Sequence, residues 1–355
     1  MRIFSGYIVR AVLSYTALVM AVLLMLIGLY MFVDQQSDVG TGRYGMFDAV
    51  LFVICNLPDQ AVTLLPVSAL LGALLALGNL ARGSELIAMR AAGASVWKIT
   101  SWVAIAGAML MVLTWLLGDY IAPPLEQFAY QQRMLAKFNQ FRVSEADSLW
   151  AKDGNMFIAV QSQHSADSYG GIYVLRFDDQ HHLLSVGHAD SAKLLDTQRW
   201  QLRNYVETQF NDDHTAVNKA ENAELKTTLS ADFIGAASKD PYQLTGGELR
   251  SYIRHLHDNH LEARDYEIAW WSRLARTAST LIIVMLAVPF SFGPMRSRGL
   301  GARMVIGILL GATFFLTARL LSDAGAVFHW QPLVVAWLPA ALLAAVTGLA
   351  ITRVR

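Results

Sequence analysis

The chain has 355 residues, of which 54% are hydrophobic and 16% charged, with 28 basic and 28 acidic side chains. Its mean hydropathy of +0.37 excludes an ordinary soluble domain. The balanced net charge says little about partners, because most charges lie in one part of the chain, and no nucleic-acid partner is expected. The one cysteine, Cys55, excludes a disulfide within the chain.

Six apolar stretches are long enough to cross a bilayer as helices, because a hydrocarbon core of about 30 Å needs about 20 apolar residues. They are Ile8–Val33, Leu57–Leu80, Ile99–Ile121, Ala269–Phe292, Met304–Leu321 and Leu333–Ile351. The first is too long for a signal peptide and lacks a small-residue cleavage site, so we expect it to be retained. This layout predicts an α-helical membrane protein with six transmembrane helices and one long insert.

Lysine and arginine in the short loops predict the orientation of the spans. One side of the membrane collects most of these cations, whereas the short loops of the other side offer Arg43 among acidic residues. Both termini are therefore expected on the cytoplasmic side, and the insert on the opposite side. The expected parts are residues 1–121 with spans one to three, the insert 122–268, and residues 269–355 with spans four to six.

The insert changes from helical to strand-like periodicity. Glu126–Phe138 is amphipathic and predicted to prolong the third span as a helix. Short β-type runs follow, separated by turns such as Asn211-Asp212: Met156–Val160, Ile172–Phe177, Leu183–Val186, Ala192–Leu195, Trp200–Phe210 and Ala223–Leu229. They favour an antiparallel, jellyroll-like all-β domain. A flanking helix is expected from Thr245 to about Leu261.

The loop between the second and third spans predicts a short cytoplasmic helix near residues 84–93. Ser84 is suited to cap its start and Gly93 to end it. Such a rigid element can occupy a groove in a partner protein. The residues expected at this contact are Ser84, Glu85, Leu86, Met89 and Arg90. An ordinary interfacial loop is the alternative that the residues leave open.

Charged residues in or beside membrane spans are costly and indicate function by default. Five cations near the outer ends of the spans predict a basic collar for anionic lipid head groups: Arg133, Lys137, Arg273, Arg276 and Arg319. Snorkelling to lipid phosphate, or pairing with Asp323, is the alternative for each cation taken singly. Phe32, Phe314 and Phe315 are expected in the core or as apolar walls for acyl chains.

The small residues of Gly307-x-x-x-Gly311 in the fifth span allow a close helix–helix approach. Packing within this chain is one interpretation of the pair. A contact with a second permease subunit is the other, and the spacing alone does not decide between them.

No convincing catalytic motif occurs in the chain. A P-loop, an H-E-x-x-H helix and a nucleophile elbow are all missing from the sequence. His255, His257 and His260 lie close together, but no cysteine or fixed ligand spacing accompanies them, so we expect a solvated helix rather than a metal site. The chain is therefore predicted to be no enzyme and to hold no cofactor of its own.

Four segments resemble the lipopolysaccharide export permease family, most closely its G-type branch. They are Phe32–Gln35, Leu70–Leu75 followed by Ser84–Leu86, Leu149–Asn155, and Phe292–Ser297. Together with the arrangement of spans, the resemblance covers the chain from end to end. It implies a half-transporter that pairs with a homologous F-type permease on a dimeric cytoplasmic ABC ATPase, which binds ATP and Mg.

The resemblance also implies roles for the elements. The helix carrying Glu85 would be the family's coupling helix, the insert its periplasmic β-jellyroll, and spans one and five its lateral gates. Arg133 matches a basic position of the head-group site, and a single-span periplasmic jellyroll protein commonly joins the complex. The implied function is ATP-driven extraction of lipopolysaccharide from the outer leaflet of the bacterial inner membrane toward the outer membrane. A membrane receptor or scaffold with a periplasmic β-domain is the alternative.

Overall fold

The computed structural model describes residues 2–138, 149–165, 168–180, 182–196, 199–210, 214–227, 240–292, 300–328 and 330–353. The turn expected at Asn211-Asp212 and the segment Gly293–Ser297 lie outside these residues. Two compact units make up the chain. The helical unit comprises Met1–Val39, Ala49–Ala129 and Arg264–Arg355, and the β unit comprises Gly40–Asp48 and Tyr130–Ala263.

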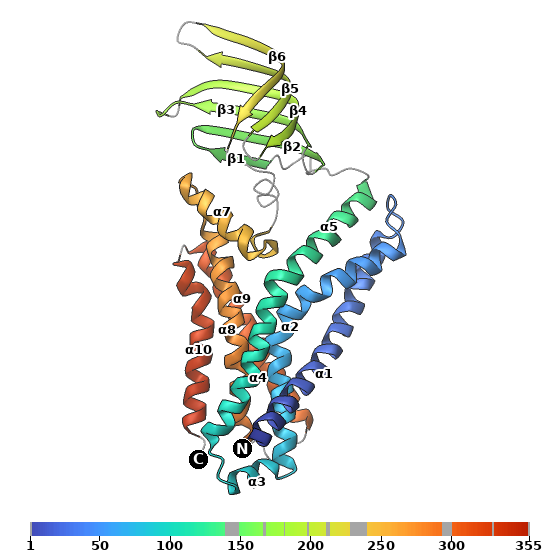
Figure 1. Cartoon of the computed structure of the whole chain (residues 1–355), viewed down its shortest axis with the longest axis vertical. Helices are drawn as coiled ribbons and strands as arrows, with labels where there is room; N and C mark the ends of the chain where they lie inside the picture. Colours follow the sequence, from blue (N-terminus) through green and yellow to red (C-terminus); the bar gives the residue numbers. More distant parts are fainter. Residues whose placement is uncertain are drawn as a thin grey trace. The chain divides into compact units, whose positions relative to one another are not determined.

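Long apolar helices build the helical unit (Figure 1). They are α1 (Arg2–Gln35), α2 (Met46–Arg82), α4 (Val96–Leu116), α8 (Arg264–Phe292), α9 (Leu300–Val327) and α10 (Pro332–Thr352). The six expected spans are confirmed, because the described residues contain six helices long and apolar enough to cross a membrane. With 37 residues, α2 is about 55 Å long and exceeds the thickness of a bilayer core.

The third span does not end where α4 ends. A single π-helical turn, η2 (Leu117–Ile121), joins α4 to α5 (Ala122–Phe138) without a break in the helix. The expected continuation Glu126–Phe138 is thereby confirmed. π-Turns are rare and occur mostly as insertions of one residue into an α-helix.

The main core of the helical unit lies where five helices meet: α1, α2, α4, α8 and the short helix α3 (Glu85–Ala91). Leu77 of α2, Val103 of α4 and Ile283 of α8 are fully buried there. Close approach of α1 and α2 depends on Gly72, where a Cβ atom would overlap the backbone of Thr16. The helices are therefore packed backbone against backbone at this crossing.

The small residues of α9 pack within this chain. A Cβ atom on Gly307 would meet Leu71 and Leu74 of α2, and one on Gly311 would lie 3.1 Å from Val67. Gly307-x-x-x-Gly311 is thus a seam between α9 and α2. The interpretation as packing within the chain is correct for this pair.

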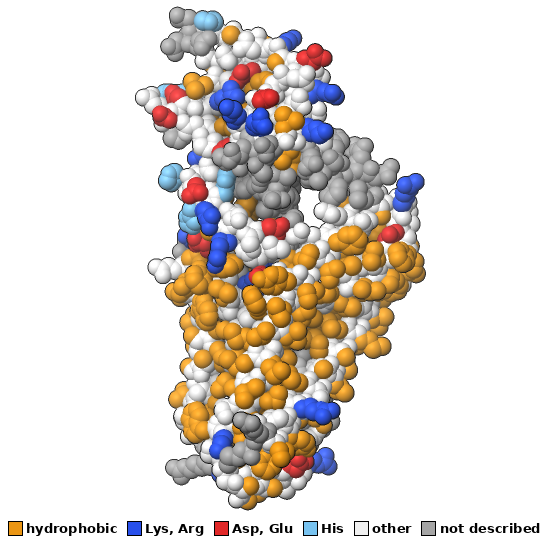
Figure 2. Space-filling model, in the orientation of Figure 1, with side chains coloured by type: hydrophobic (Ala, Val, Ile, Leu, Met, Phe, Trp, Pro, Cys, Tyr) orange, Lys and Arg blue, Asp and Glu red, His pale blue; other side chains and the backbone are white. Residues whose placement is uncertain are grey.

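Burial is uneven among the spans. Within the chain, 78% of the apolar window of α2 is buried, but only 11% of that of α1 and 12% of that of α9. Figure 2 shows hydrophobic side chains covering the visible face of the helical unit. The apolar faces of α1 and α9 are therefore left to lipid or to another protein.

The strands of the β unit form one curved antiparallel sheet (Figure 1). The sheet follows chain order: β1 (Leu149–Asp153), β2 (Met156–Ser165), β3 (Ser168–Phe177), β4 (Leu183–Asp196), β5 (Arg199–Phe210) and β6 (Thr215–Lys226). A helical membrane protein with an inserted all-β domain is the fold class expected from the sequence, and it is confirmed. All described connections in the sheet join neighbouring strands.

Some strand boundaries differ from the sequence prediction. The runs Leu183–Val186 and Ala192–Leu195 belong to the single strand β4, because its buried positions change from odd to even numbers between Ala189 and Ala192 and interrupt the alternation. The strand β1 was not expected. β6 starts at Thr215, eight residues before the predicted run, because an exposed edge strand carries mostly polar side chains.

The buried face of the sheet has an apolar part and a polar part. The rings of Tyr169 and Trp200 stack at 5.3 Å in the apolar part. In the polar part, the carboxylate of Glu207 accepts hydrogen bonds from Ser185 Oγ at 2.8 Å and from Arg176 Nη1 at 2.9 Å. The buried hydroxyl of Tyr205 has no hydrogen-bond partner in the described part of the chain.

Burial of the Tyr205 side chain is the main cause, and the nearby Glu207 carboxylate the second, that raises the pKa of Tyr205 to about 12. An unfolded tyrosine ionises at about 10, so between pH 10 and 12 the unfolded chain has lost a proton that the folded chain keeps, and stability falls as pH rises. We expect the difference between the absorbance titrations of wild type and Tyr205→Phe to show a midpoint near 12. The midpoint should return to about 10 in denaturant; a native midpoint near 10 would contradict this.

One helix of the β unit is fixed by its cap and by the sheet. At the start of α7 (Gly246–Asp258), Thr245 and Glu248 form the reciprocal hydrogen bonds of a capping box, which confirms the expected helix start. At its end, Asn259 accepts a hydrogen bond from the backbone N–H of Gly154 at 2.8 Å. α7 is therefore attached to the β1–β2 hairpin.

Candidate functional site

The helix α3 lies between two tight turns. Gly93, with φ of +91°, closes it through hydrogen bonds from Gly93 N to Arg90 O and from Ala94 N to Met89 O, which is a Schellman motif. Gly93 is thus confirmed as the helix end. Ser84 stands at the N-cap position, but its left-handed backbone, with φ of +61°, leaves its hydroxyl without a capping hydrogen bond. The expected capping role of Ser84 is wrong.

Two residues expected to face a partner instead anchor α3. Leu86 and Met89 are only 1% and 4% exposed and belong to the main core of the helical unit. The interpretation that a partner's groove takes these two side chains is therefore wrong, because the apolar side of this short helix packs against its own bundle. Glu85, Ile87 and Arg90 stay exposed.

Two exposed residues of α3 contact other helices through their charged groups. The Arg90 guanidinium lies 5.8 Å from the centre of the Phe292 ring at the end of α8, a cation–π geometry. The Glu85 carboxylate lies beside the hydroxyl of Tyr7 on α1. α3 therefore contacts α1 and α8 in addition to α2 and α4, which adjoin it in the chain.

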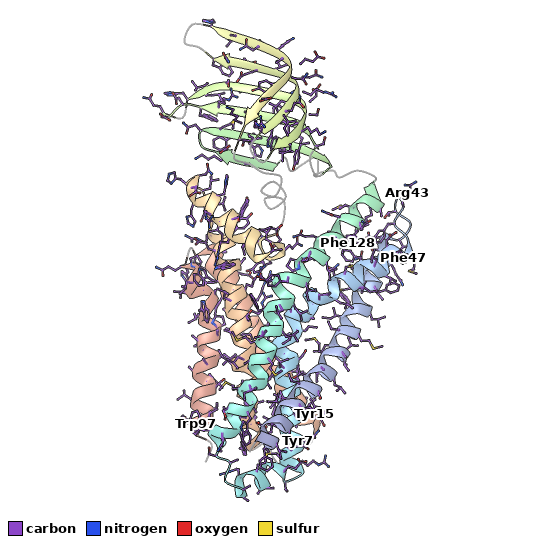
Figure 3. The ribbon with its side chains drawn as sticks, in the orientation of Figure 1. Tyr7, Tyr15, Arg43, Phe47, Trp97 and Phe128 are labelled. Carbon is purple, nitrogen blue, oxygen red and sulfur yellow. The ribbon has the colours of Figure 1, made fainter. Side chains whose placement is uncertain are left out.

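The exposed surface beside α3 continues into α4. Ile87 is 41% exposed. Trp97, which is labelled at the start of α4 in Figure 3, is 62% exposed. Ser95 caps α4 by accepting a hydrogen bond from Lys98 N at 3.3 Å. A mixed apolar and charged surface of this kind is suited to a protein contact.

The five cations of the predicted collar divide between the two units. Arg273, Arg276 and Arg319 lie in the helical unit, whereas Arg133 and Lys137 lie in the β unit. Arg273 is engaged by its own chain: its Nη1 lies 2.8 Å from Oδ1 of Asp119, and the two side chains are only 17% and 20% exposed. Arg276, on the same helix, interacts electrostatically with Asp59 of α2.

Of the remaining cations, Arg319 is exposed, whereas Arg133 and Lys137 are half-buried. Arg319 Nε lies 3.3 Å from Asp323 Oδ2, and the two side chains are 69% and 60% exposed, so the pairing alternative is correct for this residue. The Nζ atom of Lys137 lies 5.7 Å from the centre of the Tyr44 ring. Arg133 lies one turn before Lys137 on α5 and is partly exposed. Among the collar cations of the helical unit, Arg319 presents the most accessible charge to a head group.

The aromatic residues separate into core and surface. Phe314 of α9 packs against the main core, whereas Phe315 is 50% exposed on the same helix. Phe32 of α1 is partly exposed. Phe315 is therefore the one of the three best placed for contact with acyl chains.

The sequence predicts no metal site in the histidine cluster, of which His255 and His257 lie in the last turn of α7. His255 Nε2 lies 3.1 Å from the backbone oxygen of Lys152, so this ring helps to attach α7 to β1. The described residues contain no group of three His, Cys, Asp or Glu side chains placed to hold a metal ion.

Sequence reasoning missed several residues that organise these sites. Tyr7 and Phe292 support α3, Asp119 and Asp59 engage the arginines of α8, and Asn79 donates a hydrogen bond to Tyr15 Oη at 2.8 Å between α2 and α1. For Asn79 and Asp59, the sequence signal was a polar side chain inside an apolar span. Nothing in the sequence indicated the partner of each residue.

Comparison with known proteins agrees with this architecture. The family model described as "Lipopolysaccharide export system permease LptF/LptG" matches residues 6–353. The chain is 30% identical over 341 residues to the lipopolysaccharide export system permease protein LptG of Escherichia coli K12, covering 96% of this chain and 95% of the relative. It is 33% identical over 333 residues to the LptG protein of Haemophilus influenzae, covering 93% of each chain. The chain therefore belongs to the LptF/LptG family of lipopolysaccharide export permeases.

Proposed function

We propose that the chain is a permease subunit of an ATP-driven complex that extracts lipopolysaccharide from the outer leaflet of the bacterial inner membrane and passes it to a periplasmic bridge. Family membership and six apolar helices support the multi-pass membrane location. In this proposal, both termini and α3 lie on the cytoplasmic side and the β unit lies in the periplasm. Figure 1 supports the first part, since both termini and α3 lie at one end of the helical unit.

The observation that carries the proposal is the way α3 is fixed. Its apolar side is buried in the core by Leu86 and Met89, and its exposed side contacts α1 through Glu85 and α8 through Arg90. A force on this helix would therefore reach four transmembrane helices at once. A partner that changes conformation on ATP hydrolysis can act through such a rigid element.

External work is needed because acyl chains hold a lipid in the bilayer by about 0.8 kcal/mol for each buried CH₂ group. The sequence has no P-loop, so in this proposal ATP and Mg bind to a dimeric cytoplasmic ABC ATPase that docks on α3. The chain itself would be a transporter subunit and not an enzyme.

The poorly buried helices supply the surface for the other membrane partner. In this proposal, a homologous F-type permease subunit covers part of α1 and α9, and lipopolysaccharide enters between the two subunits. Arg319, Phe315 and Phe32 would meet the lipid there, while the engaged Arg273 and Arg276 would hold the helices in place. The curved sheet would receive the lipid, together with a single-span periplasmic jellyroll protein.

Replacing Glu85 by alanine tests the coupling role. We expect about tenfold weaker retention of the ATPase on the purified complex, since a hydrogen bond to a charged group contributes about 1.5–3 kcal/mol and tenfold corresponds to 1.4 kcal/mol. Copurification from membranes and lipopolysaccharide release per ATP hydrolysed are the measurements.

Asp265→Ala is the matched control, because Asp265 is an exposed acid in the first turn of α8 that forms no hydrogen bond or ion pair among the described residues. It should leave ATPase retention unchanged. Normal retention and release in Glu85→Ala would contradict the coupling role. Copurification of a kinase, or of no cytoplasmic protein, with the wild-type chain would favour a receptor or scaffold instead.

A further inference from the structure

A pocket of about 260 Å³ opens in the helical unit between α1, the end of α2 and the start of α3. Its polar lining comes from Tyr7, Arg10, Ser14, Tyr15, Asn79 and Glu85. Figure 3 shows Tyr7 and Tyr15 on the part of α1 nearest the N-terminus. Ala11, Ala76 and Leu80 supply an apolar part of the wall. The pocket therefore combines charged, hydroxyl and apolar surface.

The pocket presents two opposite charges that do not pair. Arg10 and Glu85 both line it, yet among the described residues Arg10 forms no hydrogen bond or ion pair, and the Glu85 carboxylate interacts with the Tyr7 hydroxyl and not with Arg10. Two opposite charges attract each other less strongly as the distance between them grows. Here the pocket separates them, so a ligand with one negative and one positive group would satisfy both charges.

Hydroxyl and amide groups lie between the two charges. Asn79 donates from Nδ2 to the Tyr15 hydroxyl at 2.8 Å, which fixes both side chains and leaves the Asn79 Oδ1 atom without a hydrogen bond among the described residues. The Ser14 hydroxyl is exposed on the same side of α1. The Ser14 and Tyr15 hydroxyls can donate hydrogen bonds to the ester and phosphate oxygens of a lipid head group, whereas Asn79 Oδ1 can accept one from an ammonium group.

We propose that this pocket binds the phosphoethanolamine head group of a phospholipid from the cytoplasmic leaflet. The guanidinium of Arg10 would bind the phosphate, for which its planar fork is well matched, and the Glu85 carboxylate would accept hydrogen bonds from the primary ammonium. A trimethylammonium group cannot donate those hydrogen bonds, and an anionic glycerol head group has no cation for Glu85. This assignment rests on the orientation and the coupling helix of the proposed function.

Such a lipid would add a second connection between α1 and α3, which already meet through Tyr7 and Glu85. Arg10 belongs to α1, which is little buried within the chain, and Glu85 belongs to α3. One head group that binds both would hold α1 against the helix that receives the ATPase. Lipid occupancy would then set how firmly movement of α3 is transmitted to α1.

The test is lipid retention on the full chain, purified with its partners and reconstituted separately in nanodiscs of phosphatidylethanolamine, phosphatidylcholine and phosphatidylglycerol. Native mass spectrometry counts the lipids that stay bound. We expect phosphatidylethanolamine to be retained about tenfold more than either other lipid, and Arg10→Gln to lower its retention about tenfold. Glu85→Gln should remove the preference over phosphatidylcholine. Lys98→Gln, which removes an exposed cation outside the pocket, is the control.

Equal phosphatidylethanolamine retention in wild type and Arg10→Gln would overturn the proposal. So would a wild type that retains phosphatidylglycerol as well as phosphatidylethanolamine, since that result would show a site for phosphate alone. ATPase content is measured in the same samples. Its absence from the wild type would contradict the proposed function, whereas the lipid counts decide the head-group assignment.

Discussion

Replacement of Asp119 by alanine is expected to lower the free energy of unfolding of the helical unit by about 3 kcal/mol. Asp119 Oδ1 lies 2.8 Å from Arg273 Nη1, and both side chains are largely buried between helices. Removing the carboxylate takes a charge partner from a guanidinium that is only 17% exposed, which costs more than the lost attraction alone. Thermal unfolding of the purified chain in detergent, followed by tryptophan fluorescence, measures the change.

The chain contains its own control for this pair. Arg319 and Asp323 form an ion pair on α9, but both side chains are more than half exposed. Asp323→Ala should therefore change the stability by less than about 1 kcal/mol. The double variant Asp119→Ala/Arg273→Met should recover most of the loss, because the largely buried guanidinium is removed together with the carboxylate. Equal effects of Asp119→Ala and Asp323→Ala would contradict a structural role for the buried pair.

Replacement of Gly72 by alanine is expected to destabilise the helical unit by about 2–3 kcal/mol and to lower lipopolysaccharide release. The added Cβ atom would overlap Thr16 N and Cα, and backbone cannot move aside as a flexible side chain can. α1 would have to move away from α2, and the pocket that both helices line would widen. Unfolding in detergent and release from reconstituted complexes are the measurements.

Gly348→Ala provides the matched comparison. Gly348 also lies inside a transmembrane helix, α10, but no atom lies within 4 Å of a Cβ placed there. Alanine is the better helix former by about 1 kcal/mol, so this variant should be neutral or slightly more stable. A loss of stability in Gly348→Ala equal to that in Gly72→Ala would show that helix flexibility, and not the crossing with α1, determines the effect.

The elements of the fold were predictable where local chemistry determines them. Apolar length alone located the six spans, and Thr245 with Glu248 located the start of α7. The turn at Gly93 was equally readable, because few other residues adopt its left-handed backbone. The single strand β4 was not readable, since its continuity comes from pairing with β3 on one side and β5 on the other.

The environment of the site residues was less predictable. In a seven-residue helix such as α3, about half a turn separates the face that packs on the bundle from the exposed face. By residue type, Leu86 and Met89 suit either a buried or an exposed face. Only their packing against the other helices of the bundle determines that they are buried. Glu85 and Arg90 were recognisable as exposed charges, but their contacts with Tyr7 and Phe292 join segments that are far apart in the sequence.

The pairing of Arg273 illustrates the same limit. Thr114 and Asp119 both face α8, through Thr280 at 3.4 Å and Arg273 at 2.8 Å. In an α-helix, residues five apart point about 140° away from each other, so helical periodicity predicts that Asp119 faces elsewhere. The wider π-turn at Leu117–Ile121 brings both residues onto one side.

The same turn determines the rotational phase of the helix that follows it. One additional residue turns everything after Ile121 by about 100° relative to an uninterrupted α-helix. Ala129 is thereby set against Phe52 and Cys55 of α2. If the turn became regular α-helix with all its residues kept, Phe128 would take the place of Ala129 in that contact. The π-turn therefore determines which side of α5 meets α2.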